Sequence, residues 1–261
     1  MADAEPAAAA LARLYDLDLA EDPGDLDLYL ALAARTGGPI LELMSGSGRL
    51  TVPLAAAGHQ VTGVDLDPAM LARARAAATA AGPDVDARVR LVEGDARTAR
   101  LADAGQYRLA AVPLNSIFLA ASRSEQAAVV ATLSAHLASG GLAVIDAWLP
   151  GSEDLARFDG RLVLEWVRHD PETGHVVTKS GSALYEPGTG VVTLTTLFDE
   201  GPPGEAPVRW VRTDRLRQVG PEELVALATG AGLEVDTLAG DYALDPLGAG
   251  AERVILVARR P

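Results

Sequence analysis

Residues 39–70 read PILELMSGSGRLTVPLAAAGHQVTGVDLDPAM, and this stretch decides the fold. An apolar strand at 39–44 runs into a glycine-containing loop, a helix follows at 49–58, and a second apolar strand at 61–65 ends in Asp65. Pro53 is compatible with that helix because the first four amides of a helix have no partner inside it. Strand, loop, helix and strand in this order predict two parallel strands joined by a right-handed crossover.

The same alternation continues along the chain. Asp67 and Pro68 supply a side-chain cap and a first-turn proline for a helix that ends at Gly82. We expect further strands at 89–93, 108–112, 142–147, 233–238 and 253–258, and helices at 124–138 and 221–230. The predicted fold class is α/β, with a Rossmann-like, seven-stranded, mostly parallel sheet that carries helices on both faces.

A different pattern occupies residues 150–220. Four β-like runs at 161–167, 176–185, 191–198 and 208–216 follow one another without helices, which predicts a small antiparallel insertion after the fifth strand. We therefore expect an N-terminal helical cover at 1–36 and a Rossmann-like domain formed by 37–149 and 221–261. The insertion at 150–220 would cover the substrate, form a dimer interface, or do both.

Composition excludes several classes of function. The 261 residues carry a formal net charge of −14 without a basic cluster, so we expect no nucleic-acid partner. There is no cysteine, and the four histidines lack metal-ligand spacing, so no metal is expected. Neither a secretory signal nor an apolar run of membrane-spanning length is present, which indicates a cytoplasmic protein without a membrane partner.

Chemically suitable residues follow four of the predicted parallel strands. In open parallel sheets, ligands bind at the carboxyl ends of the strands. Gly46 and Gly48 follow the first strand and would let the backbone approach a ligand closely. Asp65 ends the second strand, where a carboxylate could accept hydrogen bonds from both hydroxyls of a ribose. Asp95 follows the third strand, and Asn115 follows the fourth.

Taken together, these motifs resemble one enzyme family. The runs Glu42-Leu-Met-Ser-Gly-Ser-Gly48, Val64-Asp-Leu-Asp-Pro-Ala-Met70, Glu93-Gly-Asp-Ala-Arg97 and His136-Leu-Ala-Ser-Gly-Gly-Leu142 are similar to the class I S-adenosylmethionine-dependent methyltransferases. Within that class, the chain resembles the small-molecule group that includes the amino-sugar N-methyltransferases of bacterial natural-product pathways. The resemblance extends over nearly the whole chain, as far as Gly240-Asp-Tyr242 and Val257-Ala-Arg-Arg260.

The resemblance implies S-adenosyl-L-methionine as the cofactor and assigns residues to it. Glycine and carboxylate residues would line its methionine and ribose parts, apolar residues would contact the adenine, and Tyr15 would belong to the N-terminal cover. The cofactor-binding set is Tyr15, Glu42, Gly46, Gly48, Asp65, Leu66, Met70, Asp95, Ala96 and Pro113. The family usually has glycine where this chain has Met44, so the first turn of the loop could differ.

For substrate contact and catalysis, the candidates lie at the same predicted edge of the sheet. We expect Tyr15, Asn115 and Asp146 to carry catalytic roles, with Tyr29 and Trp148 as further contacts. Asp146 would be an acid or base that faces the substrate, or an acid that caps a loop. The methyl group on sulfonium is already activated, so alignment in line with the nucleophile would be the main task.

The expected function is therefore methyl transfer to nitrogen or oxygen of a small molecule, by a protein that we expect to form a homodimer. Two other interpretations stay open. The chain could bind S-adenosylmethionine without methylating, or be an NAD(P)-dependent oxidoreductase, although Thr51 occupies the place of the third glycine of that fingerprint. A protein side chain as methyl acceptor is also compatible with the composition.

Overall fold

The computed structural model describes residues 6–21 and 23–261, which form two compact units. The smaller unit combines the described residues before Asp22 with Pro150–Gln218. The larger unit contains the described residues of Asp22–Leu149 together with Val219–Pro261. The predicted N-terminal segment 1–36 is thus shared: helix α1 (Ala7–Asp18) belongs to the smaller unit and helix α2 (Leu26–Thr36) to the larger one.

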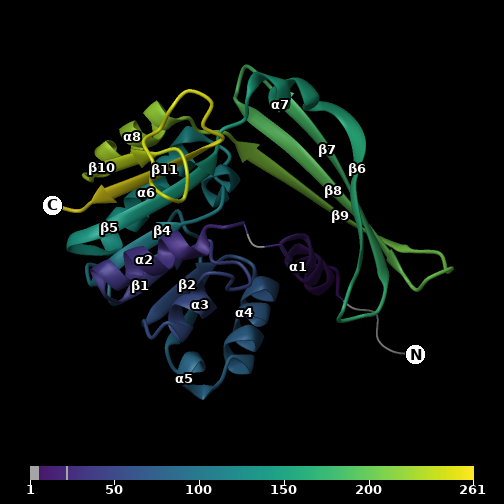
Figure 1. Ribbon diagram of the computed structural model, residues 1–261, viewed down its shortest axis with the longest axis horizontal. Coiled ribbons are helices and arrows are strands. Elements are labelled where there is room, and N and C mark those ends of the chain that lie inside the picture. Colours follow the sequence, from purple (N-terminus) through teal and green to yellow (C-terminus); the bar gives the residue numbers. More distant parts are fainter. Residues whose placement is uncertain (1–5, 22) are drawn as a thin grey trace. The chain divides into compact units, whose positions relative to one another are not determined.

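A seven-stranded sheet forms the centre of the larger unit (Figure 1). Its order is β10-β11-β5-β4-β1-β2-β3, and only β11 runs against its neighbours. The Rossmann-like, mostly parallel sheet predicted from the sequence is therefore confirmed. The strands are β1 (Ile40–Leu43), β2 (Val61–Asp65), β3 (Val89–Glu93), β4 (Tyr107–Val112), β5 (Leu137–Trp148), β10 (Glu234–Ala239) and β11 (Arg253–Arg259).

Helices cover both faces of this sheet, and local sequence explains where they begin. The Asp67 side chain accepts a hydrogen bond from the amide of Ala69 at 2.8 Å and so caps α4, as predicted. The helix that contains Pro53 is shorter than expected, because Arg49 and Leu50 form a turn before it. The elements are α3 (Thr51–Ala56), α4 (Pro68–Ala80), α5 (Pro83–Asp86), the 3-10 helix η1 (Ser116–Leu119), α6 (Arg123–His136) and α8 (Pro221–Gly230).

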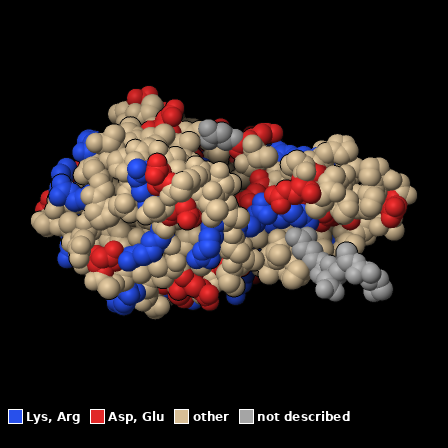
Figure 2. Space-filling view, turned by 90° about the horizontal axis from the view of Figure 1, so that it is seen from below, with Lys and Arg blue, Asp and Glu red and all other residues tan. Residues whose placement is uncertain are grey.

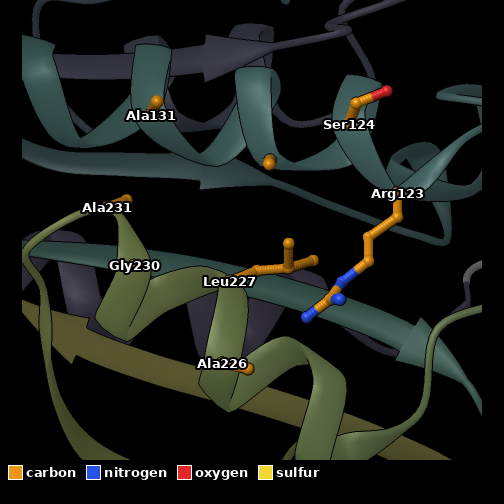
Figure 3. A pocket seen from close by; sticks show the side chains of 8 residues that line it. Arg123, Ser124, Ala131, Ala226, Leu227, Gly230 and Ala231 are labelled. Carbon is orange, nitrogen blue, oxygen red and sulfur yellow. The ribbon is translucent and has the colours of Figure 1, made fainter.

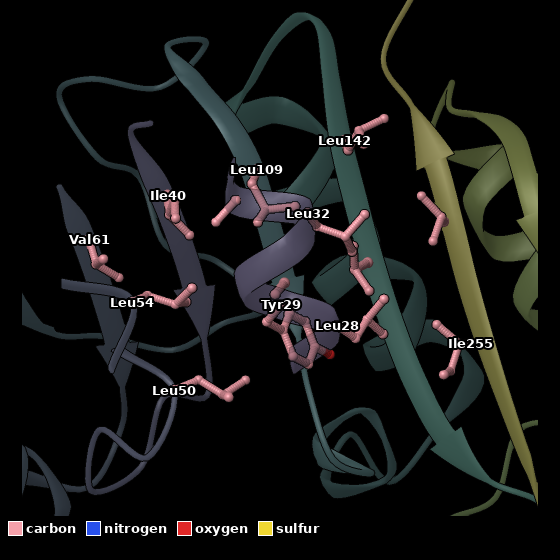
Figure 4. Close-up of a cluster of buried hydrophobic side chains, with 14 of the residues drawn as sticks. Leu28, Tyr29, Leu32, Ile40, Leu50, Leu54, Val61, Leu109, Leu142 and Ile255 are labelled. Atoms are coloured by element: carbon pink, nitrogen blue, oxygen red, sulfur yellow. The ribbon is translucent and has the colours of Figure 1, made fainter. Parts of the chain in front are cut away.

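The core explains why the central strands are almost entirely apolar. Leu28, Tyr29 and Leu32 of α2 pack with residues of α3 against one side of β1, β4, β5 and β11 (Figure 4). The alternate residues of β4, β5 and β11 are buried as well, and α6 and α8 contact these strands. Coverage of both faces makes each central strand a continuous apolar run rather than an alternating one.

Between α6 and α8 lies a groove of about 760 Å³ (Figure 3). Its lining consists mostly of small residues, and its one arginine, Arg123, forms an ion pair with Glu223 at 3.2 Å. None of the site residues predicted from the sequence contributes to this groove. Most of the predicted site residues lie instead at the strand ends.

The smaller unit is a four-stranded antiparallel sheet with α1 packed on one face, in agreement with the predicted antiparallel insertion. Leu14 of α1 packs against Val177 and Phe198, and the buried Arg13 forms ion pairs with Asp170 and Glu200. The elements are β6 (Asp159–His169), β7 (Val176–Glu186), β8 (Val191–Gly201) and β9 (Val208–Arg217), preceded by helix α7 (Ser152–Arg157).

Two further features of the described residues are the charge on one face of the surface and the length of the helices. On the face shown in Figure 2, acidic and basic side chains are interspersed. In residues 6–21 and 23–261, no helix combines the length and the apolar character that crossing a membrane requires.

Candidate functional site

The site begins with the turn that follows β1. Gly46 and Gly48 adopt positive φ angles of 54° and 85°, which glycine tolerates at little cost. A Cβ on Gly48 would lie 3.1 Å from the Cβ of Ala74, so this glycine also lets the loop pack closely on α4. Met44 has a φ of 58°, so the left-handed turn is kept although a side chain is present.

A third glycine, which the sequence analysis did not single out, supports this turn from β2. A Cβ on Gly63 would lie 2.7 Å from Oγ of Ser45 and 3.1 Å from Oγ1 of Thr51. The loop therefore rests directly on the backbone of β2, where the amide of Ser45 donates to the carbonyl of Val64 at 3.0 Å. Glycine inside a strand marks such close approaches, so the sequence did contain this information.

Asp65 joins the turn to the end of β2. Its carboxylate accepts a hydrogen bond from the amide of Gly46 at 2.7 Å and another from the amide of Asp67 at 2.9 Å. Burial raises the pKa of Asp65, and these two amides act in the opposite direction. Each oxygen keeps capacity for a further donor, since a carboxylate offers about four acceptor positions.

The end of β3 lies beside Asp65, because the amide of Gly94 donates to the Asp65 carbonyl at 2.9 Å. Asp95, the next residue, forms an ion pair with Arg97 at 2.6 Å, and the hydrogen bonds from Arg97 lower the pKa of its carboxyl group. Gly46, Asp65 and Asp95 thus lie at the ends of three neighbouring strands. Ala96 is buried next to Asp95.

The two apolar residues predicted to contact adenine differ in exposure. Leu66 follows Asp65 directly and is 63% exposed, so its side chain is available to a ligand. Met70 is only 6% exposed and belongs to the buried face of α4. The geometry therefore offers Leu66 as a contact surface, whereas Met70 belongs to the packing of α4.

On the other side of the turn, β1 buries Glu42. Its carboxylate accepts a hydrogen bond from the Thr51 hydroxyl. Burial raises the pKa of Glu42 to about 7, although Thr51 and Arg49 act to lower it. Arg49 itself holds the fully buried Asp25 through two hydrogen bonds of 2.6 and 2.7 Å.

After β4, the chain makes a second left-handed turn. Leu114 and Asn115 have φ angles of 47° and 63°, a conformation that costs about 1–2 kcal/mol for a residue such as leucine and that asparagine tolerates better. The amide of Trp148 donates to Oδ1 of Asn115 at 2.6 Å, and the amide of Asn115 donates to the backbone carbonyl of Asp146 at 3.1 Å. The turn is therefore fastened to the end of β5.

Asp146 of β5 makes several of the contacts that hold this turn. It is fully buried, accepts the amide of Leu114 at 3.0 Å and forms an ion pair with Arg253 of β11. The hydroxyl of the buried Tyr29 lies 3.4 Å from its Oδ2. Burial raises the pKa of Asp146, while Arg253 opposes that shift. Its carboxylate is thus engaged by protein groups, which favours the loop-fastening role over that of a base facing the substrate.

Two further sequence-predicted residues stand apart from this network. Tyr15 lies on α1 in the smaller unit, so its roles in cofactor binding and catalysis stay predictions. Pro113 immediately precedes the left-handed turn, at the end of β4. Arg253 and Asp25 were not anticipated, because their importance depends on partners distant in the sequence.

Comparison with known proteins gives a domain assignment. Residues 40–141 match a family model described as a methyltransferase domain. These residues span β1 to the first part of β5 and include both left-handed turns. The matched segment thus coincides with the part of the sheet where the glycine turn, Asp65 and Asp95 meet.

Similarity also extends over most of the chain. A cypemycin N-terminal methyltransferase from Streptomyces sp. is 28% identical over 233 residues, which cover 86% of this chain and 84% of that protein. The structure of an S-adenosylmethionine-dependent methyltransferase from Clostridium acetobutylicum superimposes with a TM-score of 0.76 at 16% identity, covering 96% and 98% of the two chains. The sugar N-methyltransferase KedS8 from Streptoalloteichus sp. gives 0.73 at 22%, covering 95% and 91%.

Proposed function

We propose that this S-adenosylmethionine-dependent methyltransferase methylates an amine nitrogen of a small molecule. The observation that carries the proposal is the meeting of Gly46, Asp65 and Asp95 at three neighbouring strand ends, beside the turn that contains Asn115. The relatives named for N-terminal and sugar N-methylation support an amine as the acceptor.

The residues at the ends of β1, β2 and β3 fit the adenosyl part of the cofactor. When bound, S-adenosylmethionine supplies a methyl group that its positively charged sulfur has already activated. Asp65 retains acceptor capacity for two ribose hydroxyls, and the 63% exposed Leu66 offers an apolar surface for the adenine ring. Gly46 and Gly48 keep the loop backbone free of side chains on the approach.

We assign alignment, rather than proton transfer, as the main contribution of the protein. A neutral amine already has a nucleophilic lone pair, and orientation of reacting groups alone can contribute roughly 7–11 kcal/mol. Asn115 is held by Trp148 through its Oδ1, so its amide nitrogen remains as a donor that can orient the acceptor. Asp146 keeps that turn in place without serving as the base.

Mass spectrometry tests this function directly. The purified protein would be incubated with S-adenosylmethionine and a panel of small amines, including amino sugars, with corresponding alcohols as the matched set. We expect amine products heavier by one CH₂ unit and release of S-adenosylhomocysteine. Methylation of the alcohols alone would contradict the amine assignment, and no methylation with any acceptor would contradict methyl transfer to small molecules.

We further propose that the chain forms a homodimer through the face of the four-stranded sheet opposite α1. Trp166, Phe198 and Trp210 pack toward α1. A bulge separates Leu164, which pairs with Ser180, from Trp166, which pairs with Lys179, so the register of the four strands places Leu164 on the other face. Five large apolar side chains there are between 49% and 60% exposed: Leu162, Leu164, Val167, Leu184 and Val211. Exposed apolar patches of this kind mark interaction sites.

Sedimentation velocity tests the dimer. The wild type should sediment as a dimer, and Leu164→Asp should shift it toward the monomer, because a carboxylate would have to be desolvated in the interface. The matched variant Leu119→Asp changes an exposed leucine of the larger unit and should leave the dimer intact. A monomeric wild type would contradict the proposal.

A further inference from the structure

Tyr242 lies in the loop that joins β10 to β11, close to the Asp146 network. The guanidinium of Arg253 lies 4.7 Å from the centre of the Tyr242 ring, in a cation–π contact. The loop is held in shape by Asp241, whose carboxylate accepts the amides of Ala243 at 3.0 Å and Asp245 at 3.1 Å. The phenol is therefore presented by an ordered loop on the side of the sheet that also carries Asp146.

The hydroxyl of Tyr242 is a buried polar group without a hydrogen-bond partner among the described residues. Burial raises the pKa of Tyr242 well above its ordinary value, and Asp146 adds to that effect while Arg253 opposes it. The phenol is thus neutral at physiological pH and able to donate or accept. Buried hydroxyls without partners are unfavourable, so the partner of this group is one that the described residues do not supply.

The order of strands places the loop that carries Tyr242 on one side of the sheet. Gly46, Asp65 and Asp95 follow β1, β2 and β3, which form one side of the sheet. Tyr242 belongs to the other side, where β4, β5 and β11 carry Asn115, Asp146 and Arg253. A ligand group that reaches Tyr242 therefore lies on the side of the sheet that carries the Asn115 turn.

We infer that Tyr242 is a specificity-determining residue whose hydroxyl hydrogen-bonds a polar group of the methyl acceptor, next to the amine that is methylated. This inference rests on the proposed function. An amino sugar, with hydroxyl groups adjacent to its amine, has the chemistry that such a phenol recognises. Arg253 connects the phenol ring to Asp146, so the acceptor contact and the Asn115 turn share one support.

The test is Tyr242→Phe, which removes the hydroxyl and retains the ring on Arg253. Three quantities would be compared with the wild type: the thermal unfolding midpoint, the Kd of S-adenosylhomocysteine by calorimetry, and kcat and KM for the amino sugar methylated best. We expect an unchanged or higher midpoint, a Kd within twofold, and a tenfold or greater rise in KM with little change in kcat.

Tyr107→Phe is the matched control, because the Tyr107 hydroxyl already contacts Thr62 and Asp103 at the amino end of β4. It should lower the midpoint without changing KM. For Tyr242→Phe, an unchanged KM, a markedly lower midpoint, or a tenfold weaker Kd for S-adenosylhomocysteine would each overturn the inference. A wild type that methylates no small amine would refute the proposed function and this inference with it. A wild type that methylates other amines but no amino sugar, or an active wild type with an equally active variant, would refute this inference alone.

Discussion

Arg253→Met removes one partner of the ion pair that fastens the Asn115 turn. Asp146 is fully buried and, among the residues that the structure describes, would keep only the Leu114 amide and the more distant Tyr29 hydroxyl. Removing one partner of a buried ion pair costs about 3–5 kcal/mol. Because the Arg253 side chain is itself 20% exposed, we expect the lower end, a loss of about 3 kcal/mol of unfolding free energy at pH 7.

The loss should depend on pH in a defined direction. Without Arg253, the folded-state pKa of Asp146 rises further above its unfolded value of about 3.9, since burial already raises it. A carboxyl group with a raised folded-state pKa binds its proton more tightly in the folded protein, so stability falls as pH rises above the unfolded pKa. The variant should therefore lose less stability at pH 5 than at pH 8.

Urea unfolding followed by circular dichroism at pH 5, 7 and 8 measures both effects. Arg259→Met is the matched control on the same strand, since Arg259 pairs with Asp236 at the surface and exposed pairs contribute about 0–1 kcal/mol. A loss below about 1 kcal/mol for Arg253→Met, or a loss that grows toward low pH, would refute the assigned role of the buried pair.

Three further perturbations address the glycine turn and its acids. Asp65→Ala should weaken S-adenosylhomocysteine binding in calorimetry by about 1.5–3 kcal/mol through lost hydrogen bonds to a charged group, and an unchanged affinity would remove Asp65 from the site. Glu42 with its raised pKa should lower the free energy of unfolding by roughly 3 kcal/mol as the pH rises from 4.5 to about 7, and Glu42→Gln should abolish this fall. Equal pH profiles for variant and wild type would count against a buried acid at this position. Gly63→Ala should lower the free energy of unfolding, measured in urea, by about 1–3 kcal/mol, because the added Cβ would lie 2.7 Å from Oγ of Ser45. An unchanged free energy of unfolding would show that the loop does not pack on β2.

The sequence predicted an element well where residues close to it in the chain define its ends, and less well where the ends depend on residues far away in the chain. The strand at Val89–Glu93 has the predicted bounds, because its apolar run is bracketed by polar residues that end it locally. The strand β5 begins at Leu137 rather than at residue 142, because Leu137 already pairs with Tyr107. The glycines that suggested a turn lie in the irregularity before the pairing resumes at Leu142, and Gly140 there has a φ of 74°. The short helices α5 and α7 were not predicted, as four to six residues carry too little periodicity.

For the candidate site, spacing brought out the residues that follow consecutive strands but not their partners. Gly46, Asp65 and Asp95 were placed at one edge because parallel strands end together there. The ion pair between Asp146 and Arg253 links residues 107 positions apart, and its formation depends on the register of β5 with β11. One sequence contains no local pattern that encodes that register, so a substrate-facing acid and a loop-fastening acid could not be distinguished from it.

Backbone strain gives an independent reason to place function at this edge of the sheet. Over residues 6–21 and 23–261, the non-glycine residues with positive φ are Met44, Leu114, Asn115 and Leu244. They occupy loops that follow β1, β4 and β10, and these three strands run in the same direction, so all four residues lie at the carboxyl ends of the strands. Strained conformations persist only where surrounding contacts enforce them, and they concentrate at ligand sites. Because hydrogen bonds to β5 hold the turn at Leu114 and Asn115, the protein itself fixes this conformation, as the proposed catalysis by alignment requires.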